Sequence, residues 1–186
     1  MKRHVAVLAM LFGLMQMPAQ AADWYADIAY ADGGDEFNVY VEDDDGDLST
    51  ESVSLGGGFS GSLGGINYFT ETFSFQYSLG YKEDSVTAGS DSVKFSRFPL
   101  DLVGSFDLGD VFQVGVGISH EFNPKLDLSD AGMGSHSFDD ATGEILQIGF
   151  RFTSWKLLIR QTMMDYSYEG LDFDGDNVSI RAAFIF

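Results

Sequence analysis

The last ten residues of the chain, Asn177 to Phe186, alternate strictly between apolar and mainly polar side chains. Successive side chains of a strand point to opposite faces, so this period of two predicts a β-strand with one apolar face. A chain end is usually exposed and polar; one that finishes in Phe-Ile-Phe must be covered by protein or by lipid. The apolar face carries Val178, Ile180, Ala182, Phe184 and Phe186, and the opposite face carries Ser179, Arg181 and Ala183.

The N-terminus has the order of a secretory signal. Lys2 and Arg3 precede an apolar run over residues 5–17, and the small-residue sequence Ala19-Gln20-Ala21 follows. The run is shorter than the roughly 20 apolar residues that a membrane-spanning helix needs. We therefore expect residues 1–21 to be a signal peptide cleaved after Ala21, and residues 22–186 to form one domain.

The charge of the chain is strongly acidic. Ten Lys and Arg residues face 29 Asp and Glu residues, a formal charge of −19 that becomes about −21 once Lys2 and Arg3 are removed. A protein with this much negative charge repels the phosphate backbone, which argues against nucleic acid as a partner. The chain has no cysteine, which fits passage through an oxidising periplasm without disulfides.

Alternation with a period of two recurs along the whole of residues 22–186, and no segment favours a helix. The pattern predicts an all-β fold. The three connections around Thr70, Gly109 and Ser154 are short, whereas the others are long, acidic and rich in Gly, Ser and Asp. Eight strands are expected, at 24–41 (with a bulge at Gly33-Gly34), 52–68, 73–81, 93–106, 111–122, 144–152, 155–168 and 177–186.

Aromatic residues flank every short connection and both ends of the expected domain. Rings of this kind concentrate at a membrane interface, so they predict a girdle around one rim of a barrel. A soluble barrel has no reason to expose aromatics around one end. The expected girdle consists of Trp24, Phe69, Phe73, Phe106, Phe112, Phe152, Trp155 and Phe186.

The polar residues that alternate with the apolar ones have both charge signs. Such residues can pair inside a barrel but are costly against hydrocarbon. Pro99 lies within an expected strand and predicts a bulge near residues 97–99. Gln161 falls on the outward face of its expected strand, where a polar side chain is unexpected. The expected interior network is Asp27, Gln76, Arg97, Asp101, Gln113, Glu121, Gln147, Arg151, Arg160 and Arg181.

The strand count, the terminal Phe186, the girdle and the signal resemble the small outer-membrane barrels of the OmpA transmembrane-domain, OmpX and Ail type. The resemblance implies an eight-stranded antiparallel up-and-down transmembrane β-barrel in the outer membrane. It implies contact with lipid and lipopolysaccharide, and assembly by the barrel machinery through Phe186. We expect a structural or surface-interaction role, a lumen filled by polar side chains, and a surface ligand held by the longest loop, residues 123–143.

Three alternatives remain open. A narrow channel, or a lateral route for small apolar solutes, would use the same barrel. A soluble lipocalin-like binder would instead line its cavity with apolar residues. A barrel hydrolase resembling lipid A deacylases would need Ser two residues after its histidine, but Phe122 and Phe138 follow His120 and His136. We therefore predict no catalytic residue.

Two motifs suggest ligands but lack the right context. Gly56 to Gly61 matches G-x-G-x-x-G, yet no helix follows it, so no dinucleotide or other cofactor is expected. Two acidic stretches resemble calcium loops without the EF-hand order, which leaves only weak divalent-cation binding. Their candidate ligands are Asp43, Asp45, Asp47, Asp172, Asp174 and Asp176.

Overall fold

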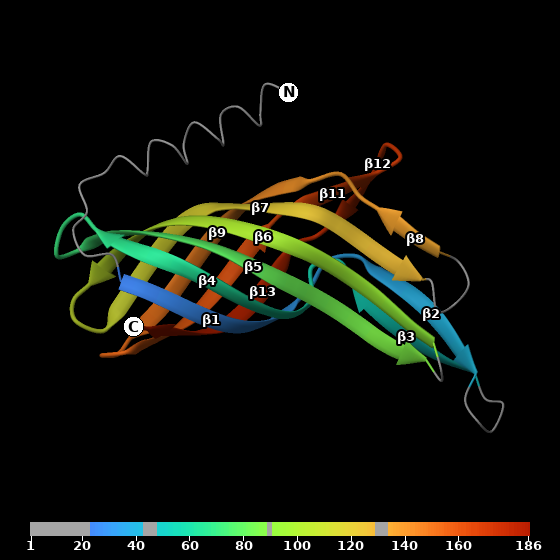
Figure 1. Ribbon diagram of the computed structural model, residues 1–186, viewed down its shortest axis with the longest axis horizontal. Coiled ribbons are helices and arrows are strands. Elements are labelled where there is room, and N and C mark those ends of the chain that lie inside the picture. Colours follow the sequence, from blue (N-terminus) through green and yellow to red (C-terminus); the bar gives the residue numbers. More distant parts are fainter. Residues whose placement is uncertain (1–22, 43–47, 89–90, 129–133) are drawn as a thin grey trace.

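The computed structural model describes residues 23–42, 48–88, 91–128 and 134–186 and contains thirteen β-strands. The expected signal peptide, residues 1–21, lies outside the described residues. Among the described residues no helix is long and apolar enough to cross a membrane. Eight strands form the barrel (Figure 1): β1 Asp23–Asp32, β4 Gly58–Tyr68, β5 Phe73–Ala88, β6 Asp91–Leu108, β7 Phe112–Leu128, β9 Ala141–Arg151, β10 Trp155–Met163 and β13 Asn177–Ile185.

The barrel sheet is antiparallel and closed. Each of the eight strands pairs with its neighbours along the chain, β1 pairs with β13, and the pairing of β6 with β7 completes the ring. Closure leaves no free edge, so the strands satisfy one another's backbone groups. The predicted all-β, eight-stranded up-and-down architecture is therefore confirmed.

One end of the barrel, here called the turn end, carries the short connections. Residues 69–72, 109–111 and 152–154 join β4 to β5, β6 to β7 and β9 to β10. Both chain ends of the sheet meet there, because Trp24 and Phe186 exchange backbone hydrogen bonds of 3.1 and 2.9 Å.

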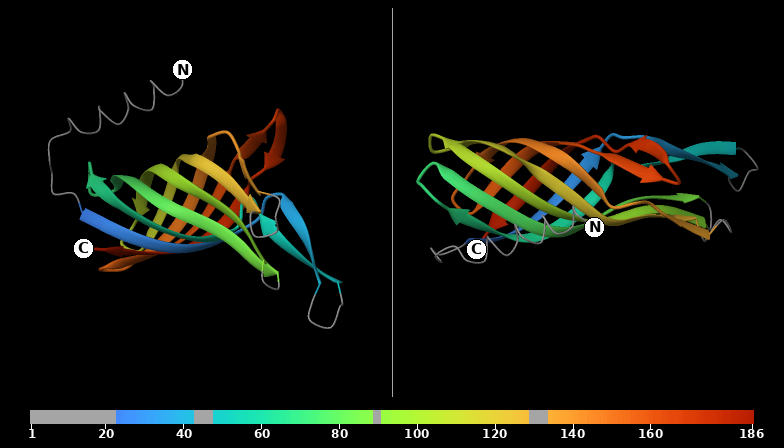
Figure 2. Two further views of the ribbon diagram at one scale, coloured as in Figure 1. Left: turned by 45° about the vertical axis from the view of Figure 1, so that its right-hand side comes forward. Right: turned by 90° about the horizontal axis from the view of Figure 1, so that it is seen from above.

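The opposite end, here called the loop end, extends beyond the barrel as further β-structure (Figure 2). Two separate hairpins rise from it, β2 with β3 and β11 with β12, and β8 pairs with the last residues of β7. The described parts of the long connections are thus largely paired strand. The five short strands are β2 Glu36–Glu42, β3 Leu48–Ser54, β8 Gly134–Ser137, β11 Asp165–Tyr168 and β12 Leu171–Asp174.

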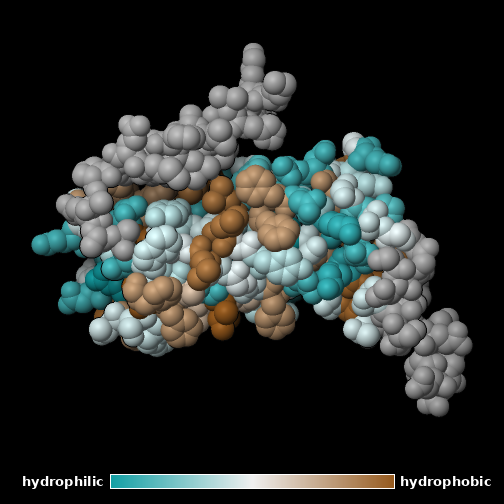
Figure 3. Space-filling view, viewed as in Figure 1, coloured by the Kyte–Doolittle hydropathy of each residue, from teal (hydrophilic) through white to brown (hydrophobic). Residues whose placement is uncertain are grey.

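Side chains of the barrel strands alternate between the interior and the outer wall. In β13, Ser179, Arg181 and Ala183 are buried while Val178, Ile180 and Phe184 are exposed. The outer wall gathers apolar side chains in its middle, and hydrophilic side chains dominate toward the loop end (Figure 3). This is the inverse of a lipocalin-like barrel, whose apolar residues face inward.

Three expected strands are each divided in two, and the expectation of continuous strands was wrong there. β1 ends at Asp32, and β2 belongs to a different sheet because Gly33 and Gly34 take φ values of 128° and 83°. L-residues rarely adopt such angles, so glycine turns the chain out of the barrel. Similarly, residues 55–57 separate β3 from β4, and Met164 separates β10 from β11.

The irregularity predicted around Pro99 is present. The pairing of β6 with β7 shifts register between Ser96 and Phe98: Ser96 pairs with Lys125, and Phe98 pairs with Phe122. The extra residue therefore lies in β7, where Asn123 has a φ of 50°. A bulge of this kind lets the sheet bend where proline cannot donate a hydrogen bond.

Candidate functional site

The expected interior residues lie inside the closed sheet. Nine of them are buried, and the tenth, Arg151, is partly exposed, with 30% of its side chain open to solvent. They form three groups along the barrel, described below from the middle outward.

Asp101 is the centre of the middle group. It forms an ion pair with Arg160, accepts a hydrogen bond of 2.7 Å from the Ser119 hydroxyl, and lies 3.7 Å from Arg181. Arg181 also pairs with Asp27 at 3.1 Å. Each carboxylate thus faces a guanidinium, which offsets the cost of burying both charges.

Gln147 and Gln76 extend the middle group toward the turn end. The Gln147 side-chain oxygen accepts two hydrogen bonds from Arg160, at 3.2 and 3.0 Å. Gln76 donates to the Ser105 hydroxyl at 3.0 Å. These amides connect the charged pairs of the middle group to those at the turn end.

Asp107 is the centre of the group at the turn end. Arg151 pairs with it at 2.7 Å, and Gln113 donates to its other oxygen at 2.7 Å. The Lys156 ammonium is buried behind Gln113, with 3.4 Å between its Nζ and the Gln113 side-chain oxygen.

The group at the loop end joins the barrel to the hairpins. Arg97, with 0% of its surface exposed, lies 3.4 Å from Glu121, and the Glu121 carboxylate accepts a hydrogen bond from the Tyr166 hydroxyl. Burial, reinforced by the nearby carboxylate, raises the pKa of the Tyr166 hydroxyl well above its ordinary value. The hydroxyl therefore remains a donor to Glu121.

The Gly56-Gly57 segment closes over this group. The Gly56 carbonyl accepts a hydrogen bond of 2.6 Å from the buried Lys82 ammonium, and the Gly57 carbonyl accepts one of 2.6 Å from Arg97. A Cβ on Gly56 would stand 2.6 Å from the carbonyl oxygens of both Gly33 and Asp176. The glycine motif that suggested a dinucleotide loop therefore allows three backbone segments to meet.

Five buried polar residues of these groups were not anticipated: Lys82, Ser105, Asp107, Lys156 and Tyr166. The alternation along the strands could have found all five. Lys82 continues the inward series of Ser74, Gln76 and Ser78, and Ser105 and Asp107 continue that of Asp101. Lys156 and Tyr166 alternate in step with the inward Arg160, and the burial of Tyr166 keeps this order although β11 is outside the barrel sheet.

A hydrophobic core, here called the loop-end core, lies beyond the polar interior. It joins both hairpins, the ends of β5, β6 and β7, and the chain before β9. The Phe95 ring lies 5.4 Å from the Tyr166 ring and 5.6 Å from the Phe138 ring, both edge to face. Its buried members are Val53, Leu55, Val93, Phe95, Leu126, Phe138, Ala141, Met164 and Tyr166.

The expected girdle residues all lie at the turn end and on the outer wall. Trp24, Phe69, Phe106, Phe152, Trp155 and Phe186 are exposed, and Phe73 and Phe112 are half-buried. Several stack on neighbours across strands or turns. The ring centroids of Phe152 and Trp155 are 4.1 Å apart, and those of Phe73 and Phe106 are 4.8 Å apart.

The two described histidines, His120 and His136, each share a hydrogen bond with a hydroxyl group. Ser119 and Glu121 point into the barrel, while His120 lies on the wall and shares a hydrogen bond of 2.7 Å with Thr142. His136 shares a 2.9 Å hydrogen bond with the Tyr168 hydroxyl. His120 therefore lies on the opposite face of β7 from Ser119 and Glu121, its neighbours in the sequence.

Three of the acidic candidates for cation binding lie within the described residues, and each accepts a hydrogen bond in or beside the β11–β12 hairpin. Asp172 accepts a hydrogen bond from Ser167, Asp174 accepts one from the Asp176 amide, and Asp176 accepts one from the Met164 amide. Within the described ranges no three Asp, Glu, His or Cys side chains converge to hold a metal ion. Asp43, Asp45 and Asp47 lie outside the described residues.

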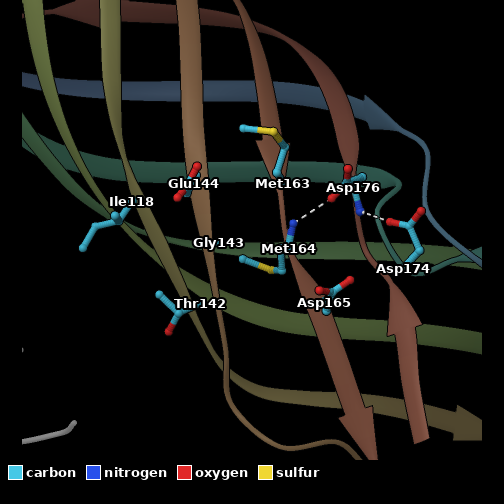
Figure 4. Close-up of a pocket in the computed structure, with 9 residues that line it drawn as sticks. All are labelled: Ile118, Thr142, Gly143, Glu144, Met163, Met164, Asp165, Asp174 and Asp176. Carbon is cyan, nitrogen blue, oxygen red and sulfur yellow. Dashed lines mark hydrogen bonds between the residues drawn. The ribbon is translucent and has the colours of Figure 1, made fainter.

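A groove with a volume of about 590 Å³ opens on the outer wall where β10 gives way to the β11–β12 hairpin (Figure 4). Met163 and Met164 lie between Glu144 of β9 on one side and the aspartates of the hairpin on the other. Inside the barrel, by contrast, the cavity bordered by Lys82, Asp101 and Arg181 has a volume of about 10 Å³. That volume holds one water molecule at most.

Comparison with known structures gives the same fold. Neisserial surface protein A is 14% identical, with a TM-score of 0.52, and the match covers 89% of this chain and 97% of that one. Ail, the attachment invasion locus protein of Yersinia pestis, solved with the heparin analogue sucrose octasulfate, is 12% identical, with a TM-score of 0.50 and the same coverage. No curated protein matches the sequence.

A family model described as the outer membrane protein beta-barrel domain matches residues 5–186, nearly the whole chain. The closed eight-stranded sheet, the apolar outer wall and the charged interior agree with this match. The chain belongs to the outer membrane β-barrel domain family, and it is an outer-membrane protein.

Proposed function

We propose that the barrel anchors a rigid acidic loop end at the cell surface, where it binds a partner, and that its lumen carries no solute. The loop-end core supports this role most directly. Both hairpins and the ends of three barrel strands pack on one apolar cluster, so the exposed residues above it are held in fixed positions. A fixed surface loses less conformational entropy on binding than a set of mobile loops.

The charge of the loop end favours a basic partner. The two outward-facing cations described there, Lys94 and Lys125, each lie beside a carboxylate, at 3.3 Å from Glu83 and 3.1 Å from Asp127. Ail was solved with a sulfated anion, and the acidic surface here favours the opposite charge. The exposed acidic residues are Asp32, Asp35, Glu36, Asp139, Asp140, Glu144, Asp165, Glu169, Asp172 and Asp174.

The interior supports a barrel without a solute path. Its described charges are paired or hydrogen-bonded across the lumen, and the 10 Å³ cavity between them cannot pass a hydrated ion. Planar-bilayer recordings of the purified protein should therefore show no steady conductance. Reproducible single-channel steps would favour the narrow-channel alternative instead.

Surface binding is tested with cells that display the barrel on immobilised polylysine and on heparin. We expect retention on polylysine that falls as salt rises, because exposed charges are screened. Asp139→Asn with Glu169→Gln should weaken retention severalfold. Both residues are exposed acids of the loop end, and Asp139 belongs to the 123–143 segment that we propose for partner contact. Phe138 of that segment is left intact because it belongs to the loop-end core.

The matched control removes two charges at the other end of the barrel. Glu71→Gln with Asp110→Asn changes the net charge equally at exposed positions of the short turns. This control should bind as the unmodified protein does. Equal retention of all three proteins, or stronger binding to heparin, would contradict the proposal.

A further inference from the structure

Aromatic pairs mark the loop-end side of the outer wall over much of the barrel, but not over all of it. Tyr30 packs on Phe59 at 5.0 Å between centroids, and Tyr81 packs on Phe98 at 5.3 Å. Phe122, whose ring lies beside that of His120, extends this row of aromatic side chains onto β7. These rings form a second belt, opposite the girdle of the turn end, as expected where a barrel wall leaves the lipid.

The belt is interrupted on β9 and β10. Register places Thr142 opposite His120, Glu144 opposite Ile118, and Met163 opposite Glu144. At this level the outward positions described on the two strands carry no aromatic ring, and Gln161 adds another polar group. The outward Gln161, which sequence alone does not explain, therefore belongs to a polar sector of the wall.

The 590 Å³ groove lies in this gap, because the β11–β12 hairpin diverges from β9 beyond Met163 (Figure 4). Met163, Met164 and Ile118 provide its apolar surface. Methionine is flexible and polarizable and adapts to varied apolar ligands. The groove thus opens sideways, at the boundary between the lipid-facing wall and the hairpins.

Four carboxylates border the groove, and none of the described Lys or Arg residues does. The side chains of Glu144 and Asp165 form no hydrogen bond or ion pair with the described residues, whereas the Asp174 and Asp176 carboxylates accept hydrogen bonds from backbone amides. The described carboxylates do not converge on a single metal position. Their negative charge is therefore distributed along the groove and complements several separate positive groups.

We propose that this groove binds an acylated polyamine, a membrane amphiphile with several ammonium groups on an apolar chain. The ammonium groups lie against the carboxylates of Glu144, Asp165, Asp174 and Asp176. The acyl chain covers Met163 and Ile118 from the lipid side. The site shares Glu144, Asp165 and Asp174 with the acidic loop end but opens on the outer wall, and its occupation does not depend on the binding of a surface partner.

The test uses protein purified in a nonionic detergent with its methionine methyl groups labelled with 13C. The signals of Met163 and Met164 are assigned with Met→Leu variants, and dodecyl-spermine, spermine and Mg²⁺ are titrated separately. We expect saturable shifts of both methyl signals with dodecyl-spermine, and binding at least about fivefold weaker with spermine, which lacks the apolar chain.

Glu144→Gln with Asp165→Asn should weaken dodecyl-spermine binding by about fivefold, because two exposed ion pairs are lost. Glu71→Gln with Asp110→Asn, the same charge change at the turn end, should leave it unchanged. Equal effects of the two variants, equal affinity for spermine and dodecyl-spermine, saturation by Mg²⁺ alone, or no saturable shift would each overturn the proposal.

Discussion

The Tyr166 hydroxyl donates a hydrogen bond to the Glu121 carboxylate, and so ties a hairpin outside the barrel to a strand of its wall. Glu121 lies in turn 3.4 Å from the fully buried Arg97. Tyr166 also belongs to the loop-end core. One side chain therefore links the apolar packing of the hairpins to the charged interior, and the loop end is continuous with the barrel.

Tyr166→Phe should destabilise the loop end. The ring still fills the core, but Glu121 loses its hydroxyl donor, at a cost of about 1 to 3 kcal/mol. Urea unfolding in lipid vesicles measures the change in the free energy of unfolding. Tyr30→Phe is the matched control, since Tyr30 is exposed and its hydroxyl forms no hydrogen bond with the described residues. Equal midpoints for the two variants would show that the hydroxyl contributes nothing.

Asp101→Leu should be among the most damaging changes in the interior. It leaves Arg160 buried without a carboxylate, a loss of about 3 to 5 kcal/mol. Adding Arg160→Met removes the unpaired charge, so the double variant should be more stable than the single one. Lys94→Met, which breaks an exposed pair, should cost at most about 1 kcal/mol. A double variant less stable than Asp101→Leu would refute this account.

Gly56→Ala should prevent the close approach of three backbone segments. Its Cβ would lie 2.6 Å from two carbonyl oxygens, and separating them is expected to cost about 2 to 3 kcal/mol. Gly61→Ala, whose Cβ would meet nothing nearer than 3.8 Å, serves as the control and should change stability by less than about 0.5 kcal/mol. The measurement is the urea midpoint, and comparable losses for both variants would be inconsistent with a steric role.

Phe186→Ala tests the proposed recognition of the C-terminus by the assembly machinery. The side chain is 74% exposed, so its loss removes little packing from the folded barrel. Refolding into vesicles should therefore match that of Phe184→Ala, which removes an exposed aromatic side chain of β13 two residues earlier. In cells, Phe186→Ala alone should lower the amount of folded protein in the outer membrane severalfold, as seen on detergent gels run with and without boiling. Equal assembly of both variants would argue against recognition of Phe186.

The interior was largely predictable because a barrel strand has a fixed period. Parity alone placed Asp27, Gln76 and Arg181 inward, and the structure buries all three. The same rule, applied further along the strands, reaches Lys82 and Lys156. The rule did not predict where the strands end at the loop end. There, glycines at 33–34 and 56–58 turn the chain out of the barrel sheet, so the expected strands are not continuous.

The sequence by itself determined the eight-stranded barrel, its turn-end girdle and the irregularity near Pro99, because each follows from local alternation or from a residue's own backbone limits. Only the tertiary structure decided the pairing of Glu121 with Arg97 and Tyr166, the loop-end core and the groove beside Glu144. These features join residues that are distant in sequence, and their contacts depend on where the hairpins leave the barrel.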